Sequence, residues 1–78
     1  MKKLVEFIVK NIVDDESSVK VVDEEQEGVK IIKLTVGKED MGKVIGKNGK
    51  VIRSIRNLVK IKSIKAKQKT FLELLPSE

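Results

Sequence analysis

The sequence of 78 residues predicts a small α+β domain with the element order helix, strand, strand, helix, helix, strand. Two stretches place apolar residues at the spacing of one helix face. Two shorter runs are dominated by β-branched residues, which is typical of strands. A glycine-containing turn separates two helical stretches in the second half. The length fits one domain, residues 1–78, with one core.

The first predicted helix spans residues 2 to about 13. The apolar residues that line one face of it are Leu4, Val5, Ile8, Val9 and Ile12. A polar loop, residues 14–18, follows and contains three acidic side chains. Adjacent acids after a helix are more typical of a solvated loop than of a metal site, so we predict no metal ligand here.

An antiparallel hairpin is predicted next. The β-branched run of residues 19–22 is a short strand, and residues 29–36 are the strongest strand pattern in the chain. Residues 23–28 between them are mostly acidic and end in a glycine, so we interpret them as a turn.

The second half is predicted to contain two helices and a final strand. Asp40 is the expected N-cap of a short helix that ends near Ile45. A longer helix follows the glycine turn, from residue 50 to about 63, and residues 69–75 form the last strand. Two residues of this strand are expected to point into the core, namely Leu72 and Leu74.

Charge is distributed unevenly between the two halves. Residues 1–40 carry 7 basic and 10 acidic side chains, whereas residues 41–78 carry 10 basic and 2 acidic ones. No Asp or Glu occurs between Met41 and Leu72. A basic half of this kind indicates a polyanionic partner, although a solvated lysine-rich surface explains charge alone equally well.

Several function classes are excluded by what the chain lacks. Without cysteine or histidine, disulfides, thiolate chemistry and the commonest acid-base residue are absent. No nucleophile-base pair or ligand cluster is visible, so we predict neither an enzyme nor a cofactor. The basic and apolar N-terminus is interrupted by Glu6 and has no cleavage site, and no stretch is long enough to span a membrane. We expect a cytoplasmic protein.

The segment Gly46-Lys47-Asn48-Gly49 is the strongest functional feature. Glycine accepts positive φ and has no side chain to hold a ligand away. The free N–H groups at the start of the following helix would face the same place, which favours phosphate binding. A glycine C-cap in a plain helix-turn-helix linker would explain one glycine, but two glycines with lysines and no nearby acid point to an anion site.

Other glycine motifs do not fit. A P-loop needs four residues between its glycines and then Gly-Lys-Ser/Thr, whereas Gly42 and Gly46 have three between them and Lys47 precedes Asn48. A dinucleotide fingerprint needs a third glycine and a preceding strand.

The residues from Val44 to Ile52 resemble the KH signature, Ile/Val-Ile-Gly-x-x-Gly-x-x-Ile, including the apolar positions on both sides. The predicted element order resembles the type II KH fold of bacteria, a three-stranded sheet with helices packed on one face. Residues 3–10 and 39–47 look like the KhpA family, the small stand-alone KH proteins of bacteria. The resemblance covers nearly the entire chain.

The resemblance implies that the loop clamps the backbone of about four nucleotides of single-stranded RNA, or of single-stranded DNA. The bases would lie in a shallow apolar groove between the helix pair and the sheet edge, with Ile32 or Leu34 as further candidates from a strand. The predicted RNA-binding residues are Gly46, Lys47, Asn48, Gly49, Lys43, Lys50, Val44, Ile45, Ile52 and Arg53. With only Phe7 and Phe71 as aromatics, binding by stacked rings, as in RRM or OB domains, is not expected.

The long helix has distinct faces at about 100° per residue. The predicted core face consists of Val51, Ile52, Ile55, Leu58 and Val59. Arg53, Arg56 and Lys60 lie roughly opposite, where they either extend the phosphate-binding surface or form a solvated back.

One apolar residue, Ile61, fits neither of these groups and lies close to Ser54. We therefore predict a self-association interface made of Ser54, Asn57 and Ile61. The resemblance implies a homodimer, and also pairing with a larger Jag-type partner that contains a KH domain.

Two functions follow. The leading prediction is a binder of single-stranded RNA that acts as a post-transcriptional regulator or RNA chaperone. The second is a protein-interaction adaptor that uses the KH fold mainly for dimerisation.

Overall fold

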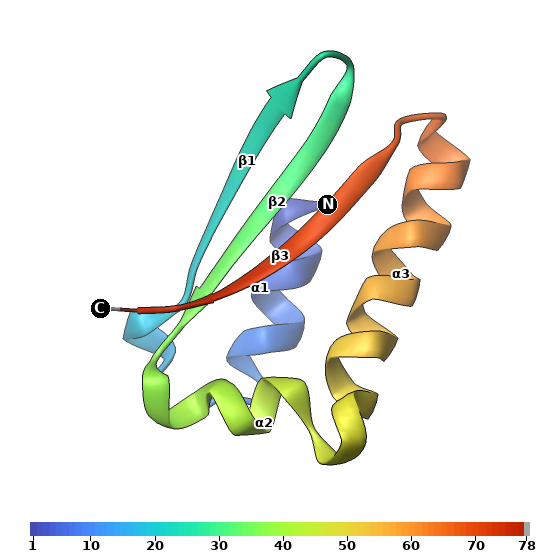
Figure 1. Cartoon of the computed structure of the whole chain (residues 1–78). Helices are drawn as coiled ribbons and strands as arrows, with labels where there is room; N and C mark the ends of the chain where they lie inside the picture. The colour runs from blue at the N-terminus through green and yellow to red at the C-terminus, as the bar shows by residue number, and fades with distance from the viewer. Residues whose placement is uncertain (78) are drawn as a thin grey trace.

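The computed structural model describes residues 1–77 and has the predicted order of elements (Figure 1). The helices are α1 (Lys2–Lys10), α2 (Met41–Ile45) and α3 (Lys50–Ala66), and the strands are β1 (Lys20–Gln26), β2 (Val29–Val36) and β3 (Thr70–Pro76). Short 3-10 turns occupy Glu16–Ser18, Lys38–Asp40 and Lys47–Gly49.

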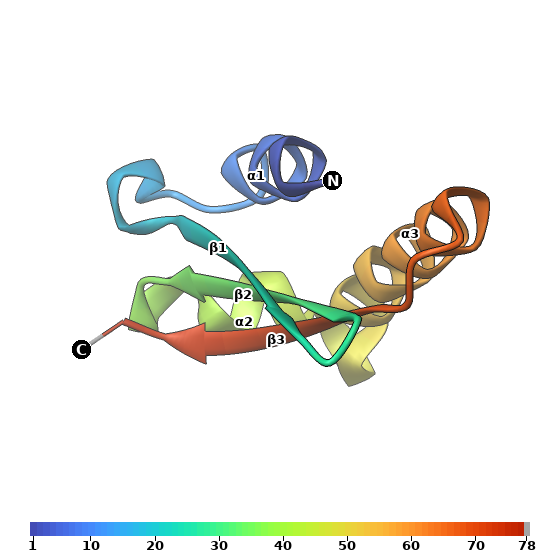
Figure 2. The same ribbon diagram turned by 90° about the horizontal axis from the view of Figure 1, so that it is seen from above.

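The three strands form one mixed sheet with β2 in the centre. β1 pairs with β2 antiparallel, as the hairpin prediction requires, and β3 pairs with β2 in parallel. A parallel pair needs a long crossover, which here runs through α2 and α3. Figure 2 shows α1 and α3 on the same side of the sheet, so the α+β fold with helices on one face is confirmed.

The core lies between this face of the sheet and the helices. Alternate residues of β2, namely Ile32, Leu34 and Val36, are fully buried, because successive side chains of a strand point to opposite faces. The helices contribute the buried residues Val5, Val9, Val44, Ile52, Ile55 and Val59. Aliphatic packing of this kind, rather than aromatic packing, holds the domain together.

The first strand is longer than predicted. Residues 23–26 belong to β1, and only Glu27 and Gly28 form the turn, both with positive φ (52° and 80°). A two-residue turn with both φ values positive matches the twist of a hairpin. The acidic residues are tolerated in the strand because they are exposed or half-buried and β1 is an edge; Glu24 pairs with Lys33 across the hairpin at 3.1 Å.

The helix ends also differ from the prediction. α1 stops at Lys10 rather than near residue 13, and α3 continues to Ala66 before Lys67 ends it in a left-handed conformation (φ 56°). Leu58 was predicted to lie in the core, but it is 44% exposed. The sheet covers only the arc through Ile55 and Val59, so a residue at the flank of that arc remains in solvent.

Asp40 occupies the position before α2, but its side chain does not cap that helix. It is buried, and its two carboxylate oxygens accept hydrogen bonds from the backbone N–H groups of Asp14 (3.2 Å) and Asp15 (3.0 Å). The capping prediction is therefore corrected: Asp40 ties the α1–β1 connection to the start of α2.

Within residues 1–77, no helix has the length and apolar character that crossing a membrane requires.

Candidate nucleic-acid interface

The loop Gly46–Gly49 joins α2 to α3 and is shaped by three left-handed or otherwise glycine-favouring residues. Gly46 has φ 77°, Asn48 has φ 56° and Gly49 has φ 73°. Asparagine is one of the few other residues that adopt such a conformation at low cost. The N–H group of Gly49 donates to the carbonyl of Gly46 at 3.1 Å and closes the turn. Lys47 and Asn48 are exposed at its tip.

The start of α3 opens directly onto this loop. The N–H group of Lys50 donates to the carbonyl of Lys47, but no side chain of the described residues caps the helix, so the next N–H groups of its first turn are open to an anion. Arg53, one turn into α3, donates a hydrogen bond to the carbonyl of Asn48. This contact fixes the loop against the helix and places a guanidinium beside it. Lys47 and Lys50 add two exposed cations.

Lys43, predicted to bind RNA, is paired with an acidic side chain of the protein. Its ammonium group forms an ion pair with Asp14, and this hydrogen bond raises the pKa of Lys43. The charge of Lys43 is therefore compensated, unlike the charges of Lys47 and Lys50, for which no ion pair is recorded within the described residues.

The apolar residues predicted to touch bases do not all reach the surface. Val44 and Ile52 are buried, where they support the loop from beneath, while Ile45 is 37% exposed beside it. Ile32 and Leu34 are fully buried because they point to the helices from the central strand. These four residues are corrected to the core, and Ile45 alone among the predicted apolar residues is available to a ligand.

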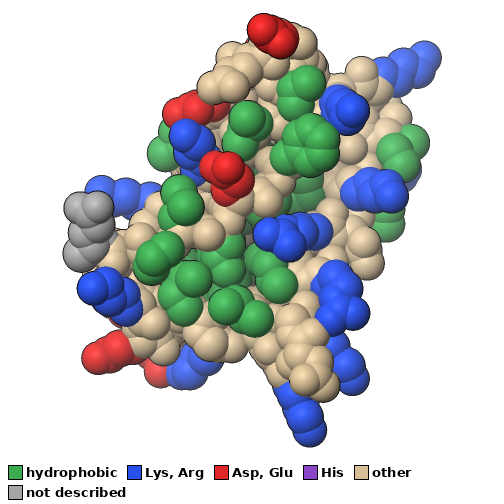
Figure 3. All heavy atoms as spheres, in the orientation of Figure 1, with side chains coloured by type: hydrophobic (Ala, Val, Ile, Leu, Met, Phe, Trp, Pro, Cys, Tyr) green, Lys and Arg blue, Asp and Glu red, His purple; other side chains and the backbone are tan. Residues whose placement is uncertain are grey.

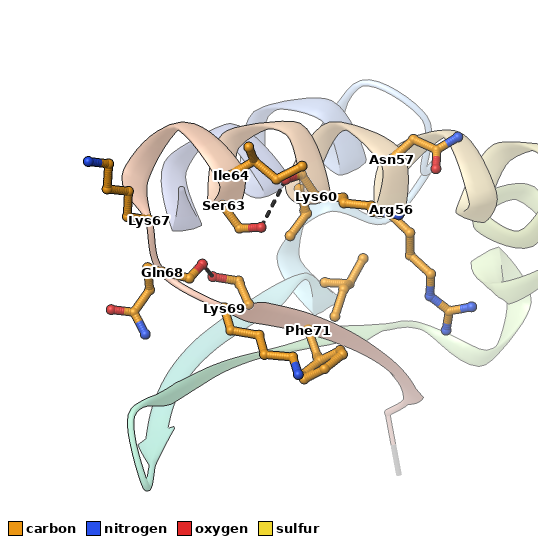
Figure 4. A pocket seen from close by; sticks show the side chains of 12 residues that line it. Arg56, Asn57, Lys60, Ser63, Ile64, Lys67, Gln68, Lys69 and Phe71 are labelled. Carbon is orange, nitrogen blue, oxygen red and sulfur yellow. Dashed lines mark hydrogen bonds between the residues drawn. The ribbon is translucent and has the colours of Figure 1, made fainter.

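A groove of about 760 Å³ lies between α3 and β3 (Figure 4). The α3 wall of the groove begins at Arg56, about 9 Å along the helix from Lys50 at a rise of 1.5 Å per residue. The lining residues are Arg56, Asn57, Val59, Lys60, Ser63, Ile64, Lys67, Gln68, Lys69, Thr70, Phe71 and Leu72. They include four cations and no acid, so the groove is apolar at its base and positive at its rim.

The β3 wall of this groove was not predicted, because the strand residues expected to line it were Ile32 and Leu34, which belong to β2. Its signal was nonetheless present. Leu72 was expected to point inward, toward the helices, and it is buried and lines the groove, while Phe71 beside it is exposed at the groove's rim. The helix residues Arg56 and Lys60, by contrast, line the groove as an extension of the predicted basic surface.

The surface of the fold shows the same uneven distribution of charge as the two halves of the sequence. Figure 3 shows Lys and Arg side chains gathered along the side of the molecule formed by α3 and the preceding loop. The acidic residues of β1 lie on the strand at the other edge of the sheet, on the far side of β2 from β3. The loop and groove thus form one positive surface, complementary to a polyanion.

The residues predicted for self-association, Ser54, Asn57 and Ile61, are all exposed on α3. Ile61 is 53% exposed, and Ile64 one turn later is exposed as well. Leu58, which was predicted to be buried but is exposed, adds to the exposed apolar surface of the helix. Asn57 and Ile64 also line the groove, so the two surfaces meet along α3.

Comparison with known proteins identifies the family. A model of the KhpA/KhpB KH domain matches residues 2–74. RNA-binding protein KhpA of Clostridium perfringens is 44% identical over 75 residues, which cover 96% of this chain and all of the relative. The KhpA proteins of Caldanaerobacter subterraneus and Listeria monocytogenes are each 41% identical over 96% of this chain and at least 99% of their own length. This is not an enzyme family, in agreement with the sequence prediction. The chain belongs to the KhpA/KhpB family of KH domains.

Proposed function

We propose that the protein binds single-stranded RNA, with the loop Gly46–Gly49 as a clamp on the sugar-phosphate backbone and the α3–β3 groove as the seat of the bases. The observation that carries this proposal is the start of α3, which no side chain of residues 1–77 caps, next to a glycine loop. Later turns of the same helix line a groove that has no acidic lining residue in this part of the chain. The relatives named above are RNA-binding proteins, which supports RNA as the ligand.

The clamp would hold any phosphate chain, because backbone N–H groups and lysines carry no base preference. Selectivity would come from Ile45 and from the groove. Such modest selectivity fits a cytoplasmic RNA chaperone or post-transcriptional regulator that meets many transcripts. RNA and single-stranded DNA of equal sequence should be compared directly, since contacts to the 2′-hydroxyl distinguish them.

The test replaces the two residues at the loop tip. The double variant Lys47→Asp/Asn48→Asp should abolish RNA binding in fluorescence anisotropy while its circular dichroism stays native, because carboxylates would face phosphates. Lys20→Asp/Gln26→Glu on β1 is the matched control: it makes the same change in net charge at exposed sites and should bind like the wild type. Wild-type protein without RNA affinity at low salt would refute the proposal.

A second function, protein-interaction adaptor, is favoured by the exposed apolar residues of α3. We propose that Ser54, Asn57 and Ile61 form a homodimer interface, and that the same surface pairs with a larger Jag-type protein. Ile61→Asp should give a monomer by light scattering, because a buried carboxylate would be unpaired. Val22→Asp, at an exposed apolar site on β1, is the control and should leave the mass unchanged. An unchanged dimer mass in the Ile61 variant would remove this interface.

A further inference from the structure

Phe71 is an exposed aromatic residue at the rim of the groove. It is the second residue of β3, and its neighbours Thr70 and Leu72 are buried, so its ring points away from the core. Phe71 is 52% exposed and is one of the residues that line the groove. An exposed aromatic side chain in a groove has no role in the core, and its flat face is available to a ligand.

One cation lies over this ring, and others line the same groove. The ammonium of Lys69 lies 5.7 Å from the ring centroid, a cation–π contact. Figure 4 shows Arg56 reaching from α3 toward the side of β3 where Phe71 lies. None of the acidic residues within positions 1–77 lines the groove. An aromatic face with cations beside it matches a nucleotide, which stacks its base and presents a phosphate, better than it matches a protein surface.

The ring lies away from the loop. The α3 residues that line the groove start at Arg56 and continue past Lys60, which are about 9 and 15 Å along the helix from Lys50 at a rise of 1.5 Å per residue. A nucleotide that contacts Phe71 is therefore a different one from those whose phosphates meet the loop.

We propose that the β3 side of the groove holds an additional nucleotide, with its base stacked on Phe71 and its phosphate paired with Lys69 and Arg56. The base displaces the Lys69 ammonium from the ring, which frees that cation for the phosphate. This inference rests on the proposed RNA binding and extends it, since it assigns a stacking residue to a groove whose other apolar residues are aliphatic.

The experiment measures affinity against RNA length. Fluorescein-labelled oligouridylates of four and eight nucleotides are titrated with wild-type protein and with Phe71→Leu, which keeps apolar bulk but removes the aromatic face. The octamer should bind Phe71→Leu about fivefold more weakly, the lower end of measured base-stacking losses, while the tetramer, which is held mainly at the loop, should lose clearly less affinity. Phe71→Tyr retains the aromatic face and should retain octamer affinity.

The chain offers a matched control. Phe7, the other phenylalanine, is exposed on α1 and does not line the groove, so Phe7→Leu should leave both affinities unchanged. A crosslinking measurement provides a direct readout: an octamer with 4-thiouridine should form an ultraviolet crosslink to the peptide that contains Phe71.

Four other outcomes would overturn the inference, and each one points to a different cause. Equal octamer affinities of wild type and Phe71→Leu, with loop variants still inactive, would leave the proposed function standing and remove the stacking site. Equal losses for both RNA lengths would show that Phe71 acts on the loop site or on the fold. A change of oligomeric mass without a change in RNA affinity would assign Phe71 to a protein interface. No binding by wild-type protein would refute the proposed function itself.

Discussion

Val51 leaves no room for a side chain on Gly46: a Cβ atom there would lie 2.8 Å from the Val51 Cβ and 2.9 Å from its backbone nitrogen. At Gly49 the nearest atom would be the Nη2 of Arg53, at 3.6 Å. The two glycines of the loop therefore differ in what they do. Gly46 packs the loop against α3, whereas Gly49 keeps the outer side of the turn open.

This difference predicts unequal stability losses. Gly46→Ala should lower the free energy of unfolding by about 2–4 kcal/mol, because the clash adds to a backbone conformation reserved for glycine. Gly49→Ala should cost about 1–2 kcal/mol, the ordinary penalty for a left-handed residue with a side chain. Urea denaturation measures both values. Equal losses would show that close packing at Gly46 is unimportant.

Val44 and Ile45 are neighbours with opposite expected effects. Val44→Ala should cost about 2 kcal/mol of stability, because it leaves a cavity in the core, and should weaken RNA binding only through that loss. Ile45→Ala should change stability little but reduce RNA affinity, since Ile45 is partly exposed beside the loop. Thermal unfolding and anisotropy titrations on both variants separate the two roles. An RNA effect confined to Val44→Ala would contradict the assignment.

The salt dependence of binding should count the phosphate contacts. Each phosphate contact to a single strand contributes about 0.7 to the slope of log affinity against log salt concentration. Lys47→Ala and Lys50→Ala should each reduce the slope by about this amount. Lys20→Ala, on β1, should leave the slope as it is, and a reduction there would indicate only diffuse attraction.

The lowered pKa of Asp15 predicts that the stability of the fold depends on pH in the acidic range. The hydroxyl groups of Ser17 (2.5 Å) and Ser18 (2.6 Å) donate to its carboxylate and lower its pKa from the ordinary value of 3.8. The lowered pKa means that the folded state favours the charged form of the Asp15 carboxylate, so ionisation of this group stabilises the fold. This stabilisation is present above the unfolded pKa and is lost as the pH falls through the folded pKa.

Replacement of both serines by alanine should return the Asp15 pKa toward 3.8 and reduce the pH dependence of unfolding in that acidic range. NMR titration of the carboxyl carbon measures the pKa directly. An unchanged pKa in the double variant would mean that the hydroxyl groups do not bond to the carboxylate in solution.

Local sequence patterns were sufficient for most of the fold. The spacing of Val5 and Val9 and the β-branched run of residues 29–36 follow directly from helix and strand geometry, so both elements were predicted correctly. Ile32 and Leu34 were nevertheless expected as candidate base contacts, and they are buried. The strand segment 23–26 could not be predicted in this way, because acidic residues disfavour strands and only pairing with β2 keeps these residues extended.

The loop of the site was predictable because its backbone conformation restricts which residue types can occupy it. Two glycines three residues apart indicated the loop, since few other residues accept its φ values. The groove was harder to predict, because its second wall depends on which strand lies next to α3. Sheet order is a long-range property, and the sequence pattern alone did not distinguish β3 from β2. For the same reason Leu58 was placed in the core, although no neighbouring element covers it.

The parallel pairing of β3 with β2 has a consequence for biosynthesis. The first residues of β3, 70–72, form one wall of the groove, yet the partner strand of β3, residues 29–36, leaves the ribosome long before them. Contacts between segments so far apart in sequence form late in folding. The glycine loop can therefore take shape on the nascent chain while the base-holding groove is still missing, and full RNA affinity should arise only after the last strand has been translated.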